Sequence, residues 1–545
     1  MKVREVMNPE PVACQAAAPV SEASRILREK GISGMPVLDG DRLVGVVSES
    51  DLLRLLKVPD EEGGLWLPSP FEILEVPVRD LIRWERMKSS LEEISGKKVS
   101  DVMNRHVWSA SPDYSLEEAA TLMTRHRVNR LPVVEDGRLV GIVTRGDIIS
   151  ALGAREGIKE IEGGICAVQG VRASGIKQGK NGVALIACSG TAAGVFTTNL
   201  VRAAPVLFTQ DNVANQGRLE GIIANSGCAN AYTGPQGIAD AREMAAILGT
   251  ILGCKPELVG VASTGVIGRY MDLGLVEGLA KEAAARLRSD PSASPEAATA
   301  IMTTDTRVKE AAVKFRGFCV AGICKGAGMI EPHMATMLGF LFTDAAVSRE
   351  NLDEALREAV DGSFNMLTVD GDTSTNDMVI IISTGKVPCQ RGDFQEALNH
   401  VCTALARKMA RDGEGASKAM EVIVEGAKSI GDARLAAKAV ARSSLVKTAL
   451  YGQDPNWGRI VCAAGYSGAK FDPDKVTLIF QAEGRSVTLV DEGKIQEGVL
   501  DQAKALMGSE EIIIRLRLGD GEASARAFGC DLTHEYVDIN AKYTT

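Results

Sequence analysis

The chain has 545 residues, of which 45% are hydrophobic and 24% are charged, and its net charge is −10. Single cores stop growing at about 250–300 residues, so a chain of this length forms several globular domains. The acidic balance argues against a general nucleic-acid or anionic-membrane surface, and we expect neither as a partner. The first residues have no apolar signal region and no apolar run is long enough to span a bilayer, so we expect a cytoplasmic protein.

The first part of the chain contains an internal repeat. The segment 35–53, MPVLDGDRLVGVVSESDLL, matches 131–149, LPVVEDGRLVGIVTRGDII, without a gap. In the second copy Ser115 and Glu118 predict a capping box at the start of a helix, and two short strands are expected on either side of Gly137. A unit of this size buries little surface alone, so we expect the two copies to pack on each other.

Both copies end in the pattern G-h-h-[ST]-x-x-D, as GVVSESD and GIVTRGD. They resemble paired cystathionine-β-synthase-type (CBS) domains, with repeats at 1–57 and 98–155 and a helical linker at 58–97. In that family the cleft between the copies often binds an adenine nucleotide. The resemblance implies nucleotide contacts from Ser48, Asp51, Thr144 and Asp147, with Arg145 near phosphate. The alternative is that each Ser/Thr–Asp pair only caps the next helix.

From residue 160 the chain alternates Gly-rich turns, short apolar strands and longer helices. It contains no P-loop, HExxH or G-x-S-x-G motif, and no regular βαβ rhythm, so a nucleotide-binding Rossmann domain is not favoured. We expect an α/β (α+β) fold class. The predicted helices are 237–252 and 351–364, and the predicted buried strands are 183–189, 221–227 and 379–385.

Eleven cysteines are distributed from Cys14 to Cys530, and none forms a C-x-x-C pair. This pattern favours buried reduced thiols over a disulfide framework or a zinc site, so we expect no metal. The run at 369–377, VDGDTSTND, has carboxylates but lacks the spacing and the closing Glu of an EF-hand loop. We therefore expect a polar loop there rather than a calcium site.

Nine stretches of small and polar residues follow one another along this second region. Each alone is typical of a turn. They are GVFTTNLVRAAPV, NSGCANAYTG, VASTGVIG, MTTDT, KGAGMIEPHMATML, VDGDTSTND, RDGEGASK, YGQDPNWGRI and the C-terminal INAKYTT. Together and in order they resemble the ornithine acetyltransferase / glutamate N-acetyltransferase family of arginine biosynthesis, from about residue 162 to the end.

The resemblance implies that the chain cleaves itself between Ala335 and Thr336, into parts 160–335 and 336–545 of an N-terminal-threonine-nucleophile fold. An α-amine has a pKa of about 7.7–8.0, so the new terminus of Thr336 can act as base for its own hydroxyl. No histidine is then needed, in a chain that has five. Outside its motif, Thr336 would be an ordinary strand residue.

The family's other site positions also have counterparts here. Thr264 and Gly265 match the oxyanion hole, and Lys325 suits a substrate carboxylate. Glu414 suits the ornithine ammonium, although Lys325 and Glu414 would otherwise be solvated surface charges. The remaining implied substrate contacts are Thr303, Thr336, Asn540 and Thr545.

The sequence also departs from the family's usual pattern. The segment between MTTDT and KGAG is about four residues short, and Cys228 and Tyr232 interrupt the usual NSGNANACTG. Glu331 and His333 stand where the family commonly has Ala and Asn. These changes bear on substrate preference rather than on the implied nucleophile.

The implied reaction is a double displacement in which Thr336 takes the acetyl group of N-acetylornithine and passes it to glutamate. No cofactor is required, acetyl-CoA is left open as a second donor, and an adenine nucleotide is the expected regulatory ligand of the CBS pair. The cleaved chains are expected to stay together as a heterotetramer of two α and two β chains. The alternatives are a self-cleaving amidase or aminopeptidase, and a nucleotide-sensing module on an inactive enzyme body.

Overall fold

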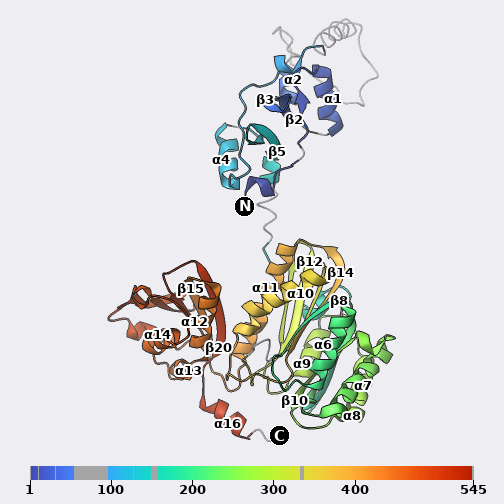
Figure 1. Cartoon of the computed structure of the whole chain (residues 1–545), viewed down its shortest axis with the longest axis vertical. Coiled ribbons are helices and arrows are strands. Elements are labelled where there is room, and N and C mark those ends of the chain that lie inside the picture. Colours follow the sequence, from blue (N-terminus) through green and yellow to red (C-terminus); the bar gives the residue numbers. More distant parts are fainter. Residues whose placement is uncertain are drawn as a thin grey trace, which may run out of the picture. The chain divides into compact units, whose positions relative to one another are not determined.

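A computed structural model describes residues 2–9, 11–30, 32–54, 96–126, 128–148, 157–331 and 337–542 (Figure 1). Contacts divide the chain into two units, Met1–Arg155 and Glu156–Thr545. The predicted linker helix lies outside the described residues. Both units mix helices and strands, so the expected α/β class is confirmed.

The first unit contains one five-stranded sheet flanked by helices. Its elements are β1 (Cys14–Gln15), α1 (Val20–Lys30), β2 (Gly34–Asp39), β3 (Arg42–Ser48), α2 (Glu49–Arg54), α4 (Leu116–His126), β4 (Arg130–Glu135) and β5 (Arg138–Thr144). The strand order is β1-β2-β3-β5-β4, so the two repeats meet at β3 and β5. The predicted capping box is confirmed: the Ser115 N–H donates to Glu118 Oε2 at 2.7 Å, and the Glu118 N–H donates to Ser115 Oγ at 3.1 Å.

The two repeats exchange their leading segments. Asn8 of the first repeat and Ile142 of the second exchange backbone hydrogen bonds of 2.9 and 3.0 Å. Asn104 of the second repeat and Val46 of the first do the same, also at 2.9 and 3.0 Å. Each repeat therefore extends the other's sheet, which confirms that the copies pack on each other.

A methionine side chain from one repeat packs directly against the motif glycine of the other repeat. A Cβ added at Gly45 would collide with the Met103 side chain, and one added at Gly141 would collide with Met7. Neither glycine has a positive φ. Their role is therefore close approach rather than turn formation.

The second unit is built on a nine-stranded sheet. Its strands are β6 (Lys159–Glu160), β7 (Arg172–Gln178), β8 (Asn181–Phe196), β9 (Arg218–Cys228), β10 (Val259–Val266), β11 (Lys309–Phe315), β12 (Phe318–Lys325), β13 (Leu338–Ala346) and β14 (Met378–Pro388). The order is β10-β9-β8-β14-β13-β12-β11-β6, with β7 paired to β8. The predicted buried strands all belong to this sheet, as parts of β8, β9 and β14.

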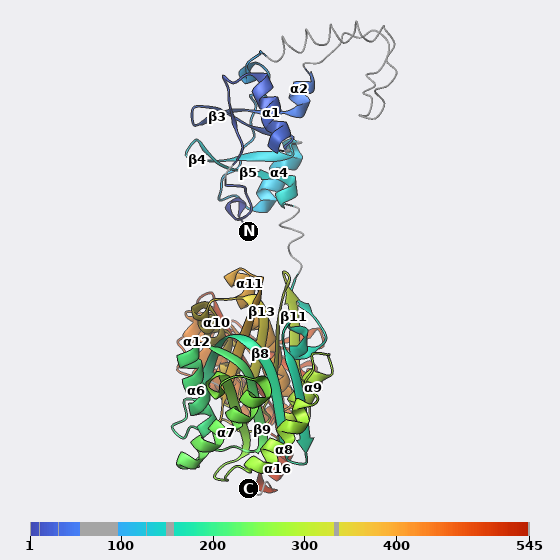
Figure 2. The same ribbon diagram turned by 90° about the vertical axis from the view of Figure 1, so that its right-hand side faces the viewer.

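Helices cover both faces of this sheet (Figure 2). They are α6 (Ala204–Gln216), α7 (Gly234–Leu252), α8 (Leu273–Ala284), α9 (Ala293–Ile301), α10 (Arg349–Gly362) and α11 (Arg391–Arg411). A strand covered on both faces must have apolar side chains on both faces, and β13 does. Phe340 and Phe342 join the core that includes α9, whereas Leu341 packs in the core with α10 and α11. The two predicted helices are confirmed as α7 and α10.

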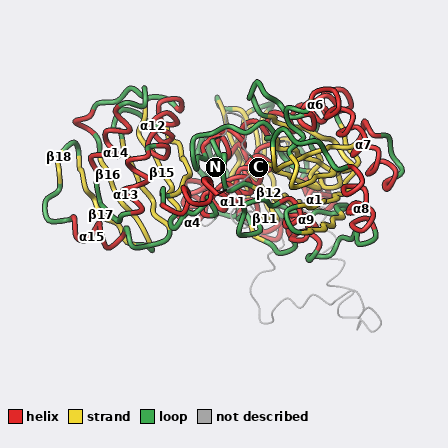
Figure 3. The backbone as a smooth tube through the Cα atoms, turned by 90° about the horizontal axis from the view of Figure 1, so that it is seen from below, coloured by secondary structure: helices red, strands yellow, loops and turns green. Residues whose placement is uncertain are grey.

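A six-stranded sheet completes this unit. Its elements are β15 (Ala419–Ala427), α12 (Ile430–Arg442), α13 (Ser444–Tyr451), α14 (Trp457–Gly465), β16 (Thr477–Ala482), β17 (Arg485–Asp491), β18 (Lys494–Ile495), α15 (Leu500–Leu506), β19 (Glu511–Arg517) and β20 (Ala523–Cys530), followed by α16 (His534–Lys542). The strand order is β18-β17-β16-β19-β15-β20, and helices accompany the strands of both sheets (Figure 3). In the part of the chain that the structure describes, no helix is long and apolar enough to cross a membrane.

A buried ion triad joins the start of β11 to the end of α11. Lys309 donates from Nζ to Asp305 Oδ1 at 2.6 Å and to Asp412 Oδ2, and the three side chains are at most 3% exposed. Backbone N–H groups of Thr306 and Arg307 also donate to Asp412. We refer to Asp305, Lys309 and Asp412 as the buried triad.

Replacing Lys309 by methionine should destabilise the second unit strongly. Met keeps the stem but leaves two buried carboxylates without their cation, and breaking a buried ion pair costs about 3–5 kcal/mol. Urea unfolding of the full chain measures the loss. The matched control is Lys281→Met, because Lys281 makes an exposed i,i+4 pair with Glu277 and should matter little. Equal stability of the two variants would contradict a structural role for the triad.

Candidate active site

Thr264 and Gly265 lie at the end of β10, beside the end of β9. The pairing of these parallel strands is irregular here, with Thr264 opposite both Ser226 and Cys228. Gly265 has φ +133°, and a Cβ there would collide with the Gly227 backbone. Only glycine fits this position, which explains the STG sequence.

Lys325 and Thr303 form the second part of the site. Lys325 is the last residue of β12, and its Nζ donates to Thr303 Oγ1 at 3.2 Å. Burial lowers the pKa of Lys325, against the opposing charges of Asp305 and Asp377. Lys325 is half-buried, and among the described residues its one hydrogen bond is to Thr303, so its ammonium retains hydrogen-bonding capacity for an anion.

Glu414 and Asn540 form the third part. Asn540 Nδ2 donates to Glu414 Oε2 at 2.9 Å, which places helix α16 against the loop between α11 and β15 that carries Glu414. The Glu414 N–H donates to Ala327 O at 2.9 Å, and a Cβ at Gly328 would collide with the Glu414 carboxylate. The carboxylate thus lies directly on the backbone of KGAG, residues 325–328, which also carries Lys325.

The buried triad holds the backbone at Thr303 and beside Lys325. Asp305 Oδ2 accepts the Thr303 N–H at 3.1 Å, and Asp305 Oδ1 accepts the N–H of Gly326, next to Lys325, at 2.6 Å. Burial would raise the pKa of Asp305, but Lys309, Lys325 and these hydrogen bonds hold it below its usual value. Asp412 is two residues from Glu414.

The run 369–377 is the polar loop expected from the sequence, and it connects the remaining site segments. Asn376 Nδ2 donates to Ala229 O at 2.6 Å and to Ser263 O at 2.9 Å, next to Thr264. Thr197 Oγ1 donates to Ser374 O at 2.9 Å. Among the described residues, no group of three or more His, Cys, Asp or Glu side chains is placed to hold a metal ion.

Two charged residues of this region were not singled out from the sequence. Asp377 is 2% exposed, its Oδ2 has no hydrogen-bond partner among the described residues, and burial raises the pKa of Asp377 well above its usual value. Lys177, in β7, donates to Ser226 Oγ at 2.8 Å and to Met302 O, next to Thr303. For Asp377, the one signal of a functional role in the sequence was its position directly before the apolar strand MVIIIS. No sequence pattern indicated a role for Lys177.

Three implied site residues, Ala335, Thr336 and Thr545, lie outside the described residues. The structure does describe Met337, which follows Thr336 in the chain. Its carbonyl accepts the Met378 N–H at 3.0 Å, and Leu338 pairs with Lys325 on one side and Met378 on the other. The chain therefore leaves the MATM motif beside the lysine of KGAG.

The four implied nucleotide contacts form helix caps. The N–H and hydroxyl of Ser48 donate to Asp51 Oδ2 at 3.0 and 2.6 Å, and those of Thr144 donate to Asp147 Oδ2 at 2.7 and 2.8 Å. This is the geometry of the capping alternative. It leaves nucleotide binding a prediction.

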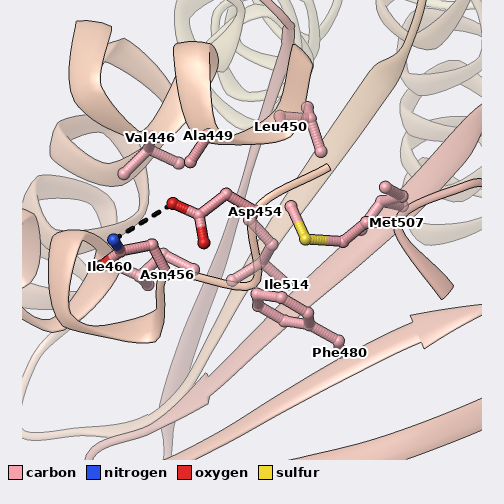
Figure 4. Close-up of a pocket in the computed structure, with 10 residues that line it drawn as sticks. Val446, Ala449, Leu450, Asp454, Asn456, Ile460, Phe480, Met507 and Ile514 are labelled. Carbon is pink, nitrogen blue, oxygen red and sulfur yellow. Dashed lines mark hydrogen bonds between the residues drawn. The ribbon is translucent and has the colours of Figure 1, made fainter. Parts of the chain in front are cut away.

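A small apolar pocket lies in the six-stranded part of the unit (Figure 4). Val446 and Leu450 of α13 face Phe480 and other apolar side chains, and Asp454 is the one carboxylate in the lining. Asp454 Oδ2 accepts a hydrogen bond from Asn456 at 3.2 Å. None of the implied site residues lines this pocket.

Comparison with known proteins identifies the family of each part of the chain. Residues 168–545 match the ArgJ family, and residues 3–58 and 99–154 each match the CBS domain. The glutamate N-acetyltransferase of Methanosarcina mazei is 53% identical over 395 residues, which is 71% of this chain and all of the relative. The arginine biosynthesis bifunctional protein ArgJ of Archaeoglobus fulgidus is 50% identical over 383 residues, which is 70% of this chain and all of that protein.

Among solved structures, the arginine biosynthesis bifunctional protein ArgJ of Bacillus halodurans is 38% identical, covering 37% of this chain and 98% of that one, with a TM-score of 0.36. The family match confirms the resemblance that the motifs indicated for both parts of the chain. The chain belongs to the ArgJ family.

Proposed function

We propose that the chain transfers the acetyl group of N2-acetylornithine to glutamate, through an acetyl ester on Thr336. The observation that carries this proposal is that KGAG holds a cation and an anion together, since Lys325 is its first residue and Glu414 lies on its backbone. A fixed ammonium beside a fixed carboxylate suits an amino acid that carries both charges. The name of the Methanosarcina mazei relative supports the same reaction.

The chemistry follows from the residues in this arrangement. The α-amine of Thr336 removes the proton of its own hydroxyl, whose oxygen attacks the acetyl carbonyl. The Gly265 N–H and the Thr264 hydroxyl stabilise the oxyanion. The C–N bond breaks, the proton passes to the leaving amine, and ornithine departs. The glutamate amine then attacks the ester and the Thr336 oxygen regains its proton.

The substrate contacts are divided between two pairs of residues, each of which contains one charged side chain. Lys325 and Thr303 take the α-carboxylate, and Glu414 with Asn540 takes the side-chain ammonium of ornithine. Thr545 is assigned to the same site by the family motif alone. Neither step needs a cofactor or a metal.

The two chains produced by cleavage would remain associated, because neighbouring strands of one sheet come from opposite sides of the cut. Strand β12 precedes residue 335 and β13 follows it, and they pair antiparallel from Val320–Thr343 to Lys325–Leu338. This pairing supports association of one α with one β chain, and we propose the heterotetramer of two α and two β chains from the family resemblance alone. Acetyl-CoA is the candidate second donor, since the Archaeoglobus fulgidus relative is named bifunctional.

The purified protein should consist of two polypeptides, 1–335 and 336–545, because catalysis requires the free α-amine of Thr336. Intact-mass spectrometry measures this directly. Thr336→Ala removes the attacking hydroxyl and should remain one full-length chain. A fully active, uncut wild-type polypeptide would contradict the mechanism.

Transfer should show parallel-line kinetics when N-acetylornithine and glutamate are varied together, because ornithine leaves before glutamate binds. Adding acetyl-CoA in place of N-acetylornithine tests the second donor in the same assay. Intersecting lines, or rapid release of acetate without glutamate, would favour the amidase alternative. A cleaved protein that neither transfers the acetyl group nor releases acetate would favour the alternative of a nucleotide-sensing module on an inactive enzyme body.

We further propose that the first unit binds an adenine nucleotide at the junction of its repeats. The observation that favours it is Arg130, which donates across the junction to Gly34 O and Ser33 Oγ and so places a cation between the two motifs. In Asp147 both capping bonds reach Oδ2, and no bond to Oδ1 is seen among the described residues. That second oxygen suits ribose hydroxyls.

Asp147→Ala should weaken nucleotide binding by about 1–3 kcal/mol, the value of hydrogen bonds to a charged group, which is roughly five- to a hundredfold in affinity. Calorimetric titration of the full chain with AMP, ADP, ATP and S-adenosylmethionine measures it, with Asp51→Ala in parallel for the first motif. No binding at millimolar nucleotide, or unchanged affinity in both variants, would leave the repeats as an assembly surface.

A further inference from the structure

The side chain of Lys177, in β7, extends across the sheet toward the candidate active site. A Cβ added at Gly182 of β8 would collide with Lys177 Cδ and Ser226 Oγ. Gly182 has no positive φ, so it provides space for this side chain rather than a turn. The Lys177 ammonium donates to Ser226 Oγ in β9 at 2.8 Å, and Ser226 pairs with Thr264 in β10. Lys177 therefore reaches the strand that lies beside Thr264.

The ammonium groups of Lys177 and Lys325 bind consecutive residues of one segment. Lys177 Nζ also donates to the carbonyl of Met302. The next residue is Thr303, whose hydroxyl oxygen accepts a hydrogen bond from Lys325 Nζ at 3.2 Å. Burial lowers the pKa of Lys177, the charge of Asp305 opposes this change, and the charge of Lys325 adds to it. The contacts and the charge effect both place the two cations in one neighbourhood.

Lys177 retains the capacity to bind an anion. It is half-buried, and an ammonium group has three donors, of which Lys177 uses two among the described residues. Its two partners are a hydroxyl and a carbonyl oxygen, so neither neutralises its charge. Lys309 differs, because it is 1% exposed and both of its carboxylate partners bind it directly. Partly buried cations are stabilised by an opposite charge, which a bound carboxylate would supply to Lys177.

The acceptor of the proposed reaction needs a cation that the donor does not need. In the proposed donor complex, Lys325 binds the α-carboxylate of N-acetylornithine and Glu414 binds its side-chain ammonium. Glutamate has a carboxylate where ornithine has that ammonium. Two carboxylates at short distance repel each other, so Glu414 disfavours the side chain of glutamate. The side chain of the acceptor must therefore turn from Glu414 toward a cation.

We propose that Lys177 binds the side-chain carboxylate of glutamate, while Lys325 and Thr303 bind its α-carboxylate. The two carboxylates of glutamate are separated by three carbon atoms, which suits two ammonium groups bound to consecutive residues. Lys177 then determines specificity for the acceptor, as Glu414 does for the donor. This inference rests on the proposed acetyl transfer. If Lys177 only bound the carbonyl after the end of α9, it would stabilise that helix end and give no preference between acceptors.

The test compares glutamate with glutamine as acetyl acceptor, using the purified full chain and N-acetylornithine as donor. Glutamine has the same shape but a neutral side chain, so the wild-type protein should prefer glutamate in kcat/KM. Lys177→Gln can still donate to Ser226 and Met302 but has no charge. It should lower kcat/KM for glutamate about ten- to a hundredfold, the range for a lost hydrogen bond to a charged group, and change that for glutamine much less. Lys177→Met is a second neutral variant, and Lys177→Arg should keep part of the preference. The matched control is Lys281→Gln, which removes an exposed cation.

The donor step separates acceptor binding from a general loss of structure. Release of ornithine from N-acetylornithine, measured without an acceptor, should suffer more in Glu414→Gln than in Lys177→Gln. An equal loss with glutamate and glutamine in both neutral Lys177 variants, or an unchanged preference for glutamate, overturns this inference alone. A wild-type protein that acetylates neither acceptor overturns the proposed acetyl transfer and this inference with it.

Discussion

The catalytic unit depends on one buried cation, Lys309, held between two buried carboxylates. Asp305 and Asp412 would repel each other without it, and burying both would be costly. The arrangement is tolerated because backbone N–H groups of residues 303, 306, 307 and 326 share the negative charge. Those same N–H groups belong to the segments that carry Thr303 and Lys325, so satisfying the carboxylates also fixes the site. Because a buried ion pair contributes little net stability, we interpret the triad as a device for placement rather than for stability.

The polar loop 369–377 has the complementary role of joining segments that are distant in sequence. Asn376 fixes the end of β10 next to Thr264, Asp370 accepts the N–H groups of Met329 and Ile330 within the MATM-containing stretch, and Asp372 and Thr373 fix Glu331. Hydrogen bonds that mostly involve side chains replace regular secondary structure here, since this backbone follows no strand or helix. The end of β10, the stretch 329–331 and the polar loop 369–377 therefore form one hydrogen-bonded network.

Local patterns predicted local structure well, and distant contacts poorly. The capping box of Ser115, the strands around Gly137 and the helices α7 and α10 follow from spacing and caps, which act over a few residues. The collision that requires glycine at 45 and 141 comes from a methionine in the other repeat, so no local pattern indicates it. The Lys309–Asp412 contact and the burial of Asp377 likewise arise only when the chain folds. The site residues themselves were predicted from the family motifs, and the structure supplies the reason why Thr303, Lys325 and Glu414 are held together.

The claim on which the account rests is that Thr336 carries the acetyl group between substrates. The most direct measurement is to mix the protein with isotope-labelled N-acetylornithine in the absence of glutamate, quench with acid within the first turnover, and map the peptides by mass spectrometry. The account predicts one labelled acetyl group on the peptide that begins with Thr336, and its loss when glutamate is added before the quench. A label on another residue, or no label while acetyl transfer proceeds at its normal rate, would contradict it.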